Sequence, residues 1–220
     1  GGGCLMFKRA LLFANGELTT HSWLAQFIAV EDFLIAVDGG LRHLLPLGRI
    51  PHLLIGDLDS VEPAQVEQLK AQGVEIRQYP VHKDETDLEL ALLAAAKMGI
   101  QELVVIGALG GRLDQTLGNI SLLLLPELKE LSVRLEDGSQ EVFVIRASTI
   151  LNGQPGDIVS LIPLWGAATG VLTEGLAYPL RNETLFPERS RGISNVMQGN
   201  QAGVSLSSGT LLCIHEHTQK

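Results

Sequence analysis

Five short apolar segments in the first 111 residues each end in turn residues, and this repeated pattern restricts the fold more than any other feature of the chain. Most of their apolar side chains stand in continuous runs and do not alternate with polar ones. Such runs are typical of strands in a parallel sheet that is covered on both faces. The segments span residues 9–16, 33–40, 52–60, 73–80 and 102–111.

Helical patterns lie between these segments. In residues 85–99, Leu88, Leu92 and Ala95 share one helical face, and Gly99 stands where a helix would end. Residues 63–73 open with Pro63, which is favoured in a first helical turn. A further helix is expected from about residue 114 to residue 125. Strands that alternate with helices predict an α/β domain with a mostly parallel sheet flanked by helices.

The pattern changes after about Pro126. Residues 133–145 are typical of two strands around a turn at Asp137–Gly138, and short strands with glycine-rich breaks follow at 156–164, 169–173, 202–209 and 210–217. No good helix pattern appears there. We therefore predict an α/β domain over residues 1–137 and an all-β sandwich over residues 138–220.

Composition excludes some classes of protein. The formal net charge of −9 argues against nucleic acid as a general partner, because no basic surface is available to neutralise phosphates. Cys4 and Cys213 lie near opposite ends of the chain, which indicates no disulfide framework. No apolar run reaches the roughly 20 residues of a membrane helix. We expect a soluble, cytoplasmic protein.

Charged residues follow the predicted strands one after another. Since the carboxyl ends of parallel strands meet at one edge of the sheet, where ligands bind, these side chains are expected to converge. Together they would repel one another unless a cation lay among them, and Mg²⁺ prefers such oxygen ligands. The set comprises the acids Asp38, Asp57, Asp59, Asp84, Asp87 and Asp114 and the bases Lys83 and Arg112.

Each motif alone also has a purely structural explanation. Asp57 and Asp59 could bond to backbone amides of a turn. Asp84 is well placed as a helix N-cap with Asp87 three residues later. The glycines after Asp38 could serve only a turn, and the full phosphate-loop spacing is missing. The joint occurrence of four such motifs, each at a predicted strand end, favours a functional site.

Five motifs together resemble the thiamine pyrophosphokinase family. They are DGG at 38–40, GDLDS at 56–60, KDETD at 83–87, GGRLDQTLGN at 110–119 and SRGISN at 190–195. Their order and spacing cover nearly the full chain. The sequence departs from the family pattern GGRxDH at one place, where Gln115 replaces the usual histidine.

The resemblance implies a homodimer with active sites between subunits, in which the α/β domain binds ATP and Mg²⁺ and the β-sandwich serves thiamine binding and dimerisation. The reaction would transfer the pyrophosphoryl group of ATP to the hydroxyl of thiamine and release AMP. On this basis Asp57, Asp59 and Asp87 would hold Mg²⁺, and Lys83 and Arg112 would contact phosphates. Further substrate or metal contacts are expected from Asp38, Gly39, Ser60, Asp84, Thr86, Asp114 and Asn119.

For the thiamine side, the resemblance implies contacts from Ser194 and Asn195 of the partner subunit. Tyr178 is the aromatic side chain we expect to stack on thiamine, whereas Trp165 is assigned to the core. His215 and His217 are read as solvent-facing, and His82 as a surface residue. The general base stays open between Asp59 and Asp87.

Two other classes of function stay open at this point. Acids at strand ends also hold paired Mg²⁺ ions in phosphohydrolases. A non-catalytic protein that senses a nucleotide would share the same pocket. The segment 190–195 and its β domain argue against the phosphohydrolase, which would not need them. A sensor would be indicated by loss of a metal acid, and none of the motif acids is missing.

Overall fold

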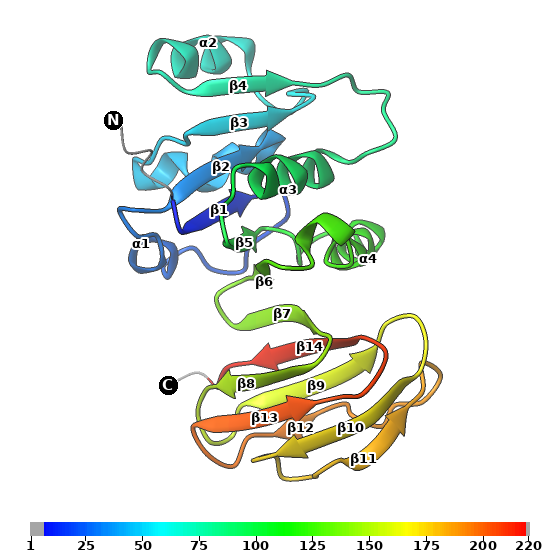
Figure 1. Ribbon diagram of the computed structural model, residues 1–220. Helices are drawn as coiled ribbons and strands as arrows, with labels where there is room; N and C mark the ends of the chain where they lie inside the picture. The colour runs from blue at the N-terminus through cyan, green and yellow to red at the C-terminus, as the bar shows by residue number, and fades with distance from the viewer. Residues whose placement is uncertain (1–6, 219–220) are drawn as a thin grey trace, which may run out of the picture. The chain divides into compact units, whose positions relative to one another are not determined.

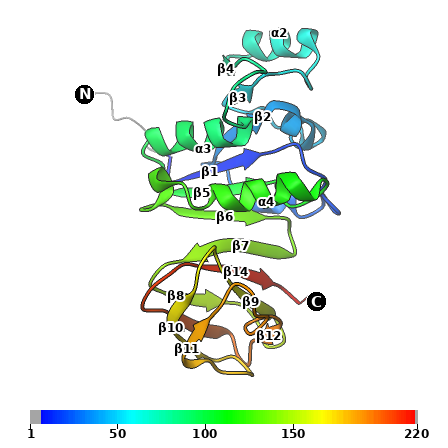
Figure 2. The ribbon, with the colours of Figure 1, turned by 90° about the vertical axis from the view of Figure 1, so that its right-hand side faces the viewer.

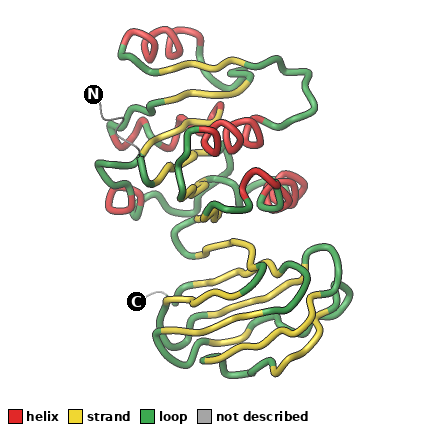
Figure 3. The backbone as a smooth tube through the Cα atoms, viewed as in Figure 1, coloured by secondary structure: helices red, strands yellow, loops and turns green. Residues whose placement is uncertain are grey.

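The structure is a computed structural model that describes residues 7–218 (Figure 1). Residues up to Gly138 form one compact unit, and those from Ser139 onward form a second. Cys4 lies outside the described residues. Helices belong to the first unit, and the described part of the second contains strands and loops only (Figure 3). No helix of the described residues is long and apolar enough to cross a membrane.

The first unit is built on a six-stranded parallel sheet with the order β6-β5-β1-β2-β3-β4. The arrowheads of β1 to β4 point to the same side in Figure 1. The chain fills the sheet from β1 outward to β4 and then returns to place β5 on the other side of β1. The strands are β1 (Arg9–Phe13), β2 (Phe33–Val37), β3 (Leu53–Gly56), β4 (Glu75–Gln78), β5 (Glu102–Ile106) and β6 (Ser132–Glu136).

Both faces of this sheet are covered, as the apolar runs predict. On one face Leu11, Phe13 and Leu34 pack with side chains from α1, η1 and α2. On the other face α3 lies against β1, β2 and β3 and buries Leu88 and Leu92 (Figure 2). The helices are α1 (Leu24–Phe27), α2 (Pro63–Ala71), α3 (Asp87–Lys97) and α4 (Leu113–Leu122), with 3-10 turns η1 (Asp38–His43), η2 (Leu45–Leu47) and η3 (Pro126–Leu128).

The start of α3 corrects one expectation. Its N-cap is Thr86, whose hydroxyl oxygen accepts a hydrogen bond from the Glu89 backbone N–H at 3.2 Å. Asp84, the cap in the purely structural explanation of this motif, lies two residues too early and is exposed. Asp87 is thereby the first helical residue, where its negative charge is favourable next to the helix dipole.

The second unit is a sandwich of two antiparallel sheets. One has the order β12-β9-β14-β7 and the other β11-β10-β13-β8. Apolar side chains from both sheets, such as Leu161 and Leu211 from one and Val171 and Val204 from the other, form a single core. The strands are β7 (Gln140–Ile145), β8 (Ser148–Asn152), β9 (Ile158–Pro163), β10 (Ala168–Glu174), β11 (Arg181–Leu185), β12 (Asn195–Val196), β13 (Gln201–Ser205) and β14 (Leu211–Glu216). An α/β unit followed by an all-β unit is the predicted fold class, which is confirmed.

Two side-chain predictions in this unit are wrong. Trp165 is 64% exposed and is not a core residue. His215 is 1% exposed and does not face solvent. It continues the inward row of Leu211 and Cys213 along β14, because alternate residues of a strand face the same side. Burial raises the pKa of the Cys213 thiol to about 12.

Asp157 is the buried partner of His215. Its Oδ2 accepts hydrogen bonds from His215 Nε2 at 2.7 Å and from the Gln154 backbone N–H at 3.1 Å. Its Oδ1 accepts two more from Thr218. Burial alone would raise the pKa of Asp157, but the bonds from Thr218, His215 and Gln154 outweigh it and hold the pKa well below the ordinary value. The carboxylate thus fastens the loop before β9 to the segment after β14.

We predict that Asp157→Ala lowers the free energy of unfolding by about 3 kcal/mol at neutral pH, because it leaves a buried imidazole and backbone donors without a partner. A depressed folded-state pKa stabilises the fold above the unfolded pKa, about 3.9, and this contribution is lost as pH falls toward the folded value. Denaturant unfolding at several pH values should show a difference from wild type that is constant above about pH 5 and shrinks below about pH 4. The exposed Glu216→Gln is the control, and equal stability of the Asp157 and Glu216 variants would contradict the assignment.

Candidate active site

A pocket of about 530 Å³ opens at the carboxyl edge of the parallel sheet. It lies next to the point where strand order reverses, between β1 and β5, which is the usual ligand position in open α/β sheets. Loops after β1, β2, β3 and β5, the first turn of α3 and one side of α4 along its length supply its walls. The lining residues are Ala14, Asn15, Gly16, Val37, Asp38, Asp57, Asp59, Ser60, Thr86, Asp87, Leu88, Glu89, Gly107, Gly110, Asp114, Gln115, Gly118, Asn119 and Leu122.

Close backbone approach shapes the pocket between the loops after β1 and β5. The Gly16 N–H donates to the Gly107 carbonyl at 2.7 Å. A Cβ on Gly16 would come within 2.2 Å of that same oxygen, so no other residue fits there without moving the backbone. The glycine therefore sets how close the two loops can lie.

Three carboxylates gather in the pocket. One oxygen from each of Asp38, Asp57 and Asp59 lies within 4.8 Å of the others. Asp38 is buried at the end of β2 with a φ of +47°, and Leu58, between the other two acids, has a φ of +64°. Positive φ is unfavourable for both residue types, so packing must hold these conformations. The Ser60 N–H donates to Asp38 Oδ1 at 3.4 Å, and the Asp59 N–H donates to Asp57 Oδ1 at 3.1 Å.

Asp87 lies beside this group in a different role. Its Oδ1 forms an ion pair with Lys83 Nζ at 2.7 Å, and its Oδ2 accepts from the Asp57 N–H at 3.3 Å. The hydrogen bond to Asp87, together with the charges of Asp57 and Asp38, raises the pKa of Lys83 and keeps it cationic. A Cβ on Gly56 would lie 2.9 Å from Asp87 Oδ2 and 3.1 Å from Asp38 Cβ, so the glycine makes room for the acids on both sides.

Arg112 and Asp114 pair with each other at the start of α4. The Arg112 guanidinium donates to both carboxylate oxygens, at 3.1 Å from Nε and 2.6 Å from Nη2. The hydrogen bond from Arg112 lowers the pKa of Asp114. The arginine side chain is 72% exposed and does not line the pocket, whereas Asp114 does. Gln115, in the place of the family's usual histidine, also lines it.

The other predicted contacts divide into three groups. Ser60, Thr86 and Asn119 line the pocket, and the Asn119 amide donates to the Ala108 carbonyl at 3.0 Å. Gly39 and Asp84 do not line it. The last group belongs to the β unit and consists of Tyr178, Ser194 and Asn195.

Asn195 is buried in the β unit, and both the oxygen and the nitrogen of its side-chain amide are hydrogen-bonded. Its Oδ1 accepts from the Tyr178 N–H at 3.0 Å, and its Nδ2 donates to the Tyr178 carbonyl at 2.7 Å. Ser194 has a φ of +58°, and its N–H donates to Ser160 Oγ. Tyr178 itself is 67% exposed. The asparagine therefore fixes the backbone that presents the tyrosine ring.

The loop after β1 lines the pocket but contains none of the residues predicted from the sequence. Asn15 and Gly16 line the pocket, and Arg42 holds them: its Nε donates to Asn15 Oδ1 at 2.8 Å and its Nη2 to both backbone carbonyls. His43 Nε2 lies 2.9 Å from the Gly16 carbonyl, and burial lowers the pKa of this imidazole. The available signal was position, because Asn15 and Gly16 directly follow a strand of the same sheet.

An open α/β sheet with an acid-lined pocket at its carboxyl edge, followed in the chain by a β-sandwich, defines a two-unit protein with a ligand site in its first unit. Two family models match it: "Thiamin pyrophosphokinase, catalytic domain" over residues 24–135 and "Thiamin pyrophosphokinase, vitamin B1 binding domain" over residues 147–211. The chain belongs to the thiamin pyrophosphokinase family.

Similar proteins span nearly the whole chain. The thiamine pyrophosphokinase of Bacillus subtilis is 30% identical over 209 residues, which cover 94% of this chain and 98% of the relative. A crystal structure of the Bacillus subtilis protein superimposes with a TM-score of 0.85 at 27% identity, covering 96% of this chain and 100% of that one. A family member from Enterococcus faecalis gives a TM-score of 0.83 at 25% identity, with coverage of 96% and 100%.

We predict that Gly16→Ala destabilises the chain by about 1–3 kcal/mol, because the added methyl collides with a backbone oxygen that cannot rotate away. Denaturant unfolding measures the change. Gly166→Ala is the matched control, since a Cβ at Gly166 meets nothing within 4 Å. Equal stability of the two variants would show that the loops after β1 and β5 can separate freely.

Proposed function

We propose that this chain transfers the pyrophosphoryl group of ATP to the hydroxyl of thiamine, giving thiamine diphosphate and AMP. The observation that carries the proposal is the group of three pocket carboxylates, Asp38, Asp57 and Asp59, in a chain that matches both domains of the family. Lys83 adds a cation beside them, held by Asp87.

The acids fit a magnesium ion. Ligand oxygens around one Mg²⁺ stand about 3–4 Å apart, given metal–oxygen distances near 2.1 Å. The three oxygens lie within 4.8 Å of one another. Rotation of the side chains would bring them to the spacing of oxygens around one Mg²⁺. Carboxylates are also the ligands this ion prefers. We propose that Asp38, Asp57 and Asp59 hold it. Asp87, which the family resemblance implies as a metal ligand, would instead act through Lys83.

The bound ion would neutralise the charge that develops on phosphate oxygens. The residues of the chain do the remaining work of positioning, which dominates phosphoryl-type transfer. Lys83 would contact a phosphate while Asp87 fixes its ammonium in place. Arg112, whose exposed guanidinium can exchange Asp114 for a phosphate, would bind the nucleotide from the start of α4. Gly16 and Gly107 let the loops after β1 and β5 lie close together at the edge of the pocket.

The β unit would recognise thiamine. Tyr178 has an exposed ring that can stack on a cationic heterocycle, and Asn195 holds the backbone of Tyr178. Ser194 is proposed as a polar contact to thiamine. The unit that contains these residues matches the vitamin B1 binding domain of the family.

We also propose a homodimer. Leu113 and Leu117 stand one turn apart on α4 and are 71% and 48% exposed. Burying them against a second copy would remove apolar surface from water beside the pocket. Sedimentation that shows a fully active monomer would contradict this. The cytoplasmic location stays a prediction from cysteine content, and Cys213 is a free, buried thiol.

Incubation with ATP, Mg²⁺ and thiamine tests the function. We expect AMP to appear only when thiamine is present. Phosphate release without thiamine would instead indicate a phosphohydrolase. Tight ATP binding without any release would indicate a nucleotide sensor. Either result would overturn the proposed transfer.

The same assay tests the metal ligands. Asp59→Asn removes one negative charge from the group without changing its shape, and we predict that activity falls by at least about 100-fold while the melting temperature stays near wild type. Glu67→Gln, an exposed change on α2, is the control. Activity within a few-fold of the control would remove Asp59 from the ligand set.

A further inference from the structure

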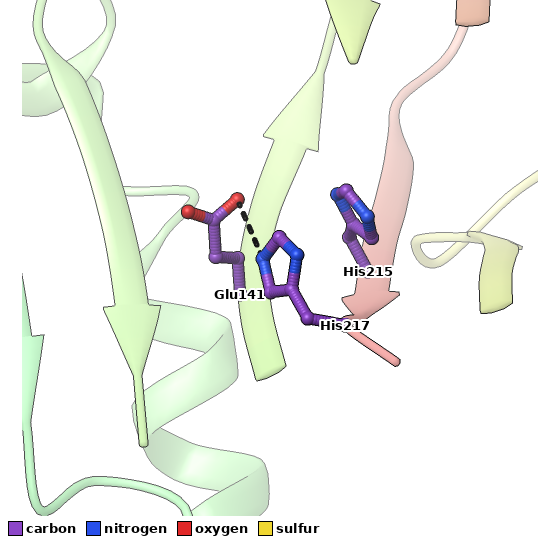
Figure 4. A group of neighbouring side chains, drawn as sticks. All are labelled: Glu141, His215 and His217. Carbon is purple, nitrogen blue, oxygen red and sulfur yellow. Dashed lines mark ion pairs between the residues drawn. The ribbon is translucent and has the colours of Figure 1, made fainter. Parts of the chain in front are cut away.

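A second cluster of metal-ligating side chains lies in the β unit and has no part in the proposed reaction. Glu141, His215 and His217 each offer one ligand atom, and these atoms lie within 4.8 Å of one another. Figure 4 shows the Glu141 carboxylate and the His217 imidazole pointing toward each other, with His215 beside them. His217 Nε2 lies 3.9 Å from Glu141 Oε2.

The strand register explains why these residues meet. His215 on β14 is the direct neighbour of Glu141 on β7. His217 follows two residues later and points to the same side. The inward rows Leu211–Cys213–His215 and Ile145–Phe143–Glu141 are therefore adjacent, and both change from apolar to ligating residues at the same end of the sandwich.

Asp157 lies beside both imidazoles and is hydrogen-bonded to that of His215. Its Oδ2 lies 2.7 Å from His215 Nε2 and 3.4 Å from His217 Nδ1. A carboxylate that accepts the N–H of His215 Nε2 leaves the lone pair of that ring on Nδ1. In His217 the nitrogen nearer Glu141 is Nε2. Imidazoles that bind metals are usually held by such an outer carboxylate, which fixes the tautomer and raises the basicity of the ligand.

A structural role for Asp157 explains only part of this cluster of side chains. The hydrogen bonds that Asp157 accepts from Thr218 and Gln154 explain why a buried carboxylate stabilises this part of the fold. They give no reason for a second histidine beside His215. At 3.9 Å, His217 and Glu141 are too far apart for a hydrogen bond, but an ion between them would contact both.

We propose that Glu141, His215 and His217 form a site for a divalent ion of the zinc class, with Asp157 as the outer carboxylate. Two imidazoles and one carboxylate form a known zinc ligand set with a fourth position for water. Tetrahedral ligands around zinc stand about 3.4 Å apart, so the observed spacing needs only a small contraction. His217 is partly exposed and borders a cavity of about 210 Å³ with Thr218 and Glu216, which gives an ion access.

Titration of the full chain with Zn²⁺ in excess Mg²⁺ tests the site. The magnesium occupies sites made only of oxygens and competes weakly for imidazole. We expect one Zn²⁺ per chain, a higher melting temperature on binding, and an X-ray absorption spectrum with two imidazole nitrogens at about 2.0–2.1 Å. The ion joins the end of β14 to β7, so the melting temperature should report its binding.

His217→Ala is the decisive variant, because the side chain is partly exposed and its loss leaves the bond between His215 and Asp157 intact. It should weaken Zn²⁺ affinity at least about tenfold and abolish the thermal shift. His82→Ala, an exposed histidine of the other unit, should change neither. Unchanged affinity in His217→Ala, or a spectrum without imidazole, would overturn the site. Transfer to thiamine should be the same in both variants, which separates this test from that of the proposed function.

Discussion

The repulsion between carboxylates that parallel strands bring to one edge is the constraint on which the first unit depends. Asp38 ends β2, and Asp57 and Asp59 follow β3, so the sheet itself places their oxygens within 4.8 Å of one another. The fold tolerates this because Lys83 pairs with the neighbouring Asp87 and backbone N–H groups bond to Asp38 and Asp57. What remains is negative charge directed into a pocket, which suits a divalent ion and a cationic substrate.

The β unit handles buried charge differently. Asp157 and His215 are both 1% exposed, and the carboxylate is surrounded by donors from Gln154, Thr218 and His215. A charge that is matched this completely stabilises the fold, whereas removing one partner leaves the other without compensation. In the first unit the charges of Asp38, Asp57 and Asp59 face the pocket, where a ligand can bind them. In the second unit the buried charge of Asp157 is bonded to residues of the same unit. The three carboxylates of the first unit are therefore available to a ligand, whereas Asp157 serves the stability of the sandwich.

Much of the fold could be predicted because its signals are local. Continuous apolar runs with turn residues gave β1 to β5, and the position of the acids after those strands indicated the pocket. The predictions that failed depend on packing. Trp165 is exposed although tryptophan is usually buried, and His215 is buried although it stands among polar residues near the chain end. Thr86 caps α3 in place of Asp84 because the helix begins two residues later than the charge pattern suggests.

The sequence by itself determined the α/β and all-β halves, the family motifs, and the acids available for a metal, because periodicity and residue type are properties of neighbouring positions. Only the tertiary structure decided which acids group together and that Asn15 lines the pocket. It also brought Glu141 and Asp157 to His215 and His217. Distances between side chains on different strands depend on register and backbone conformation, and no local pattern encodes them.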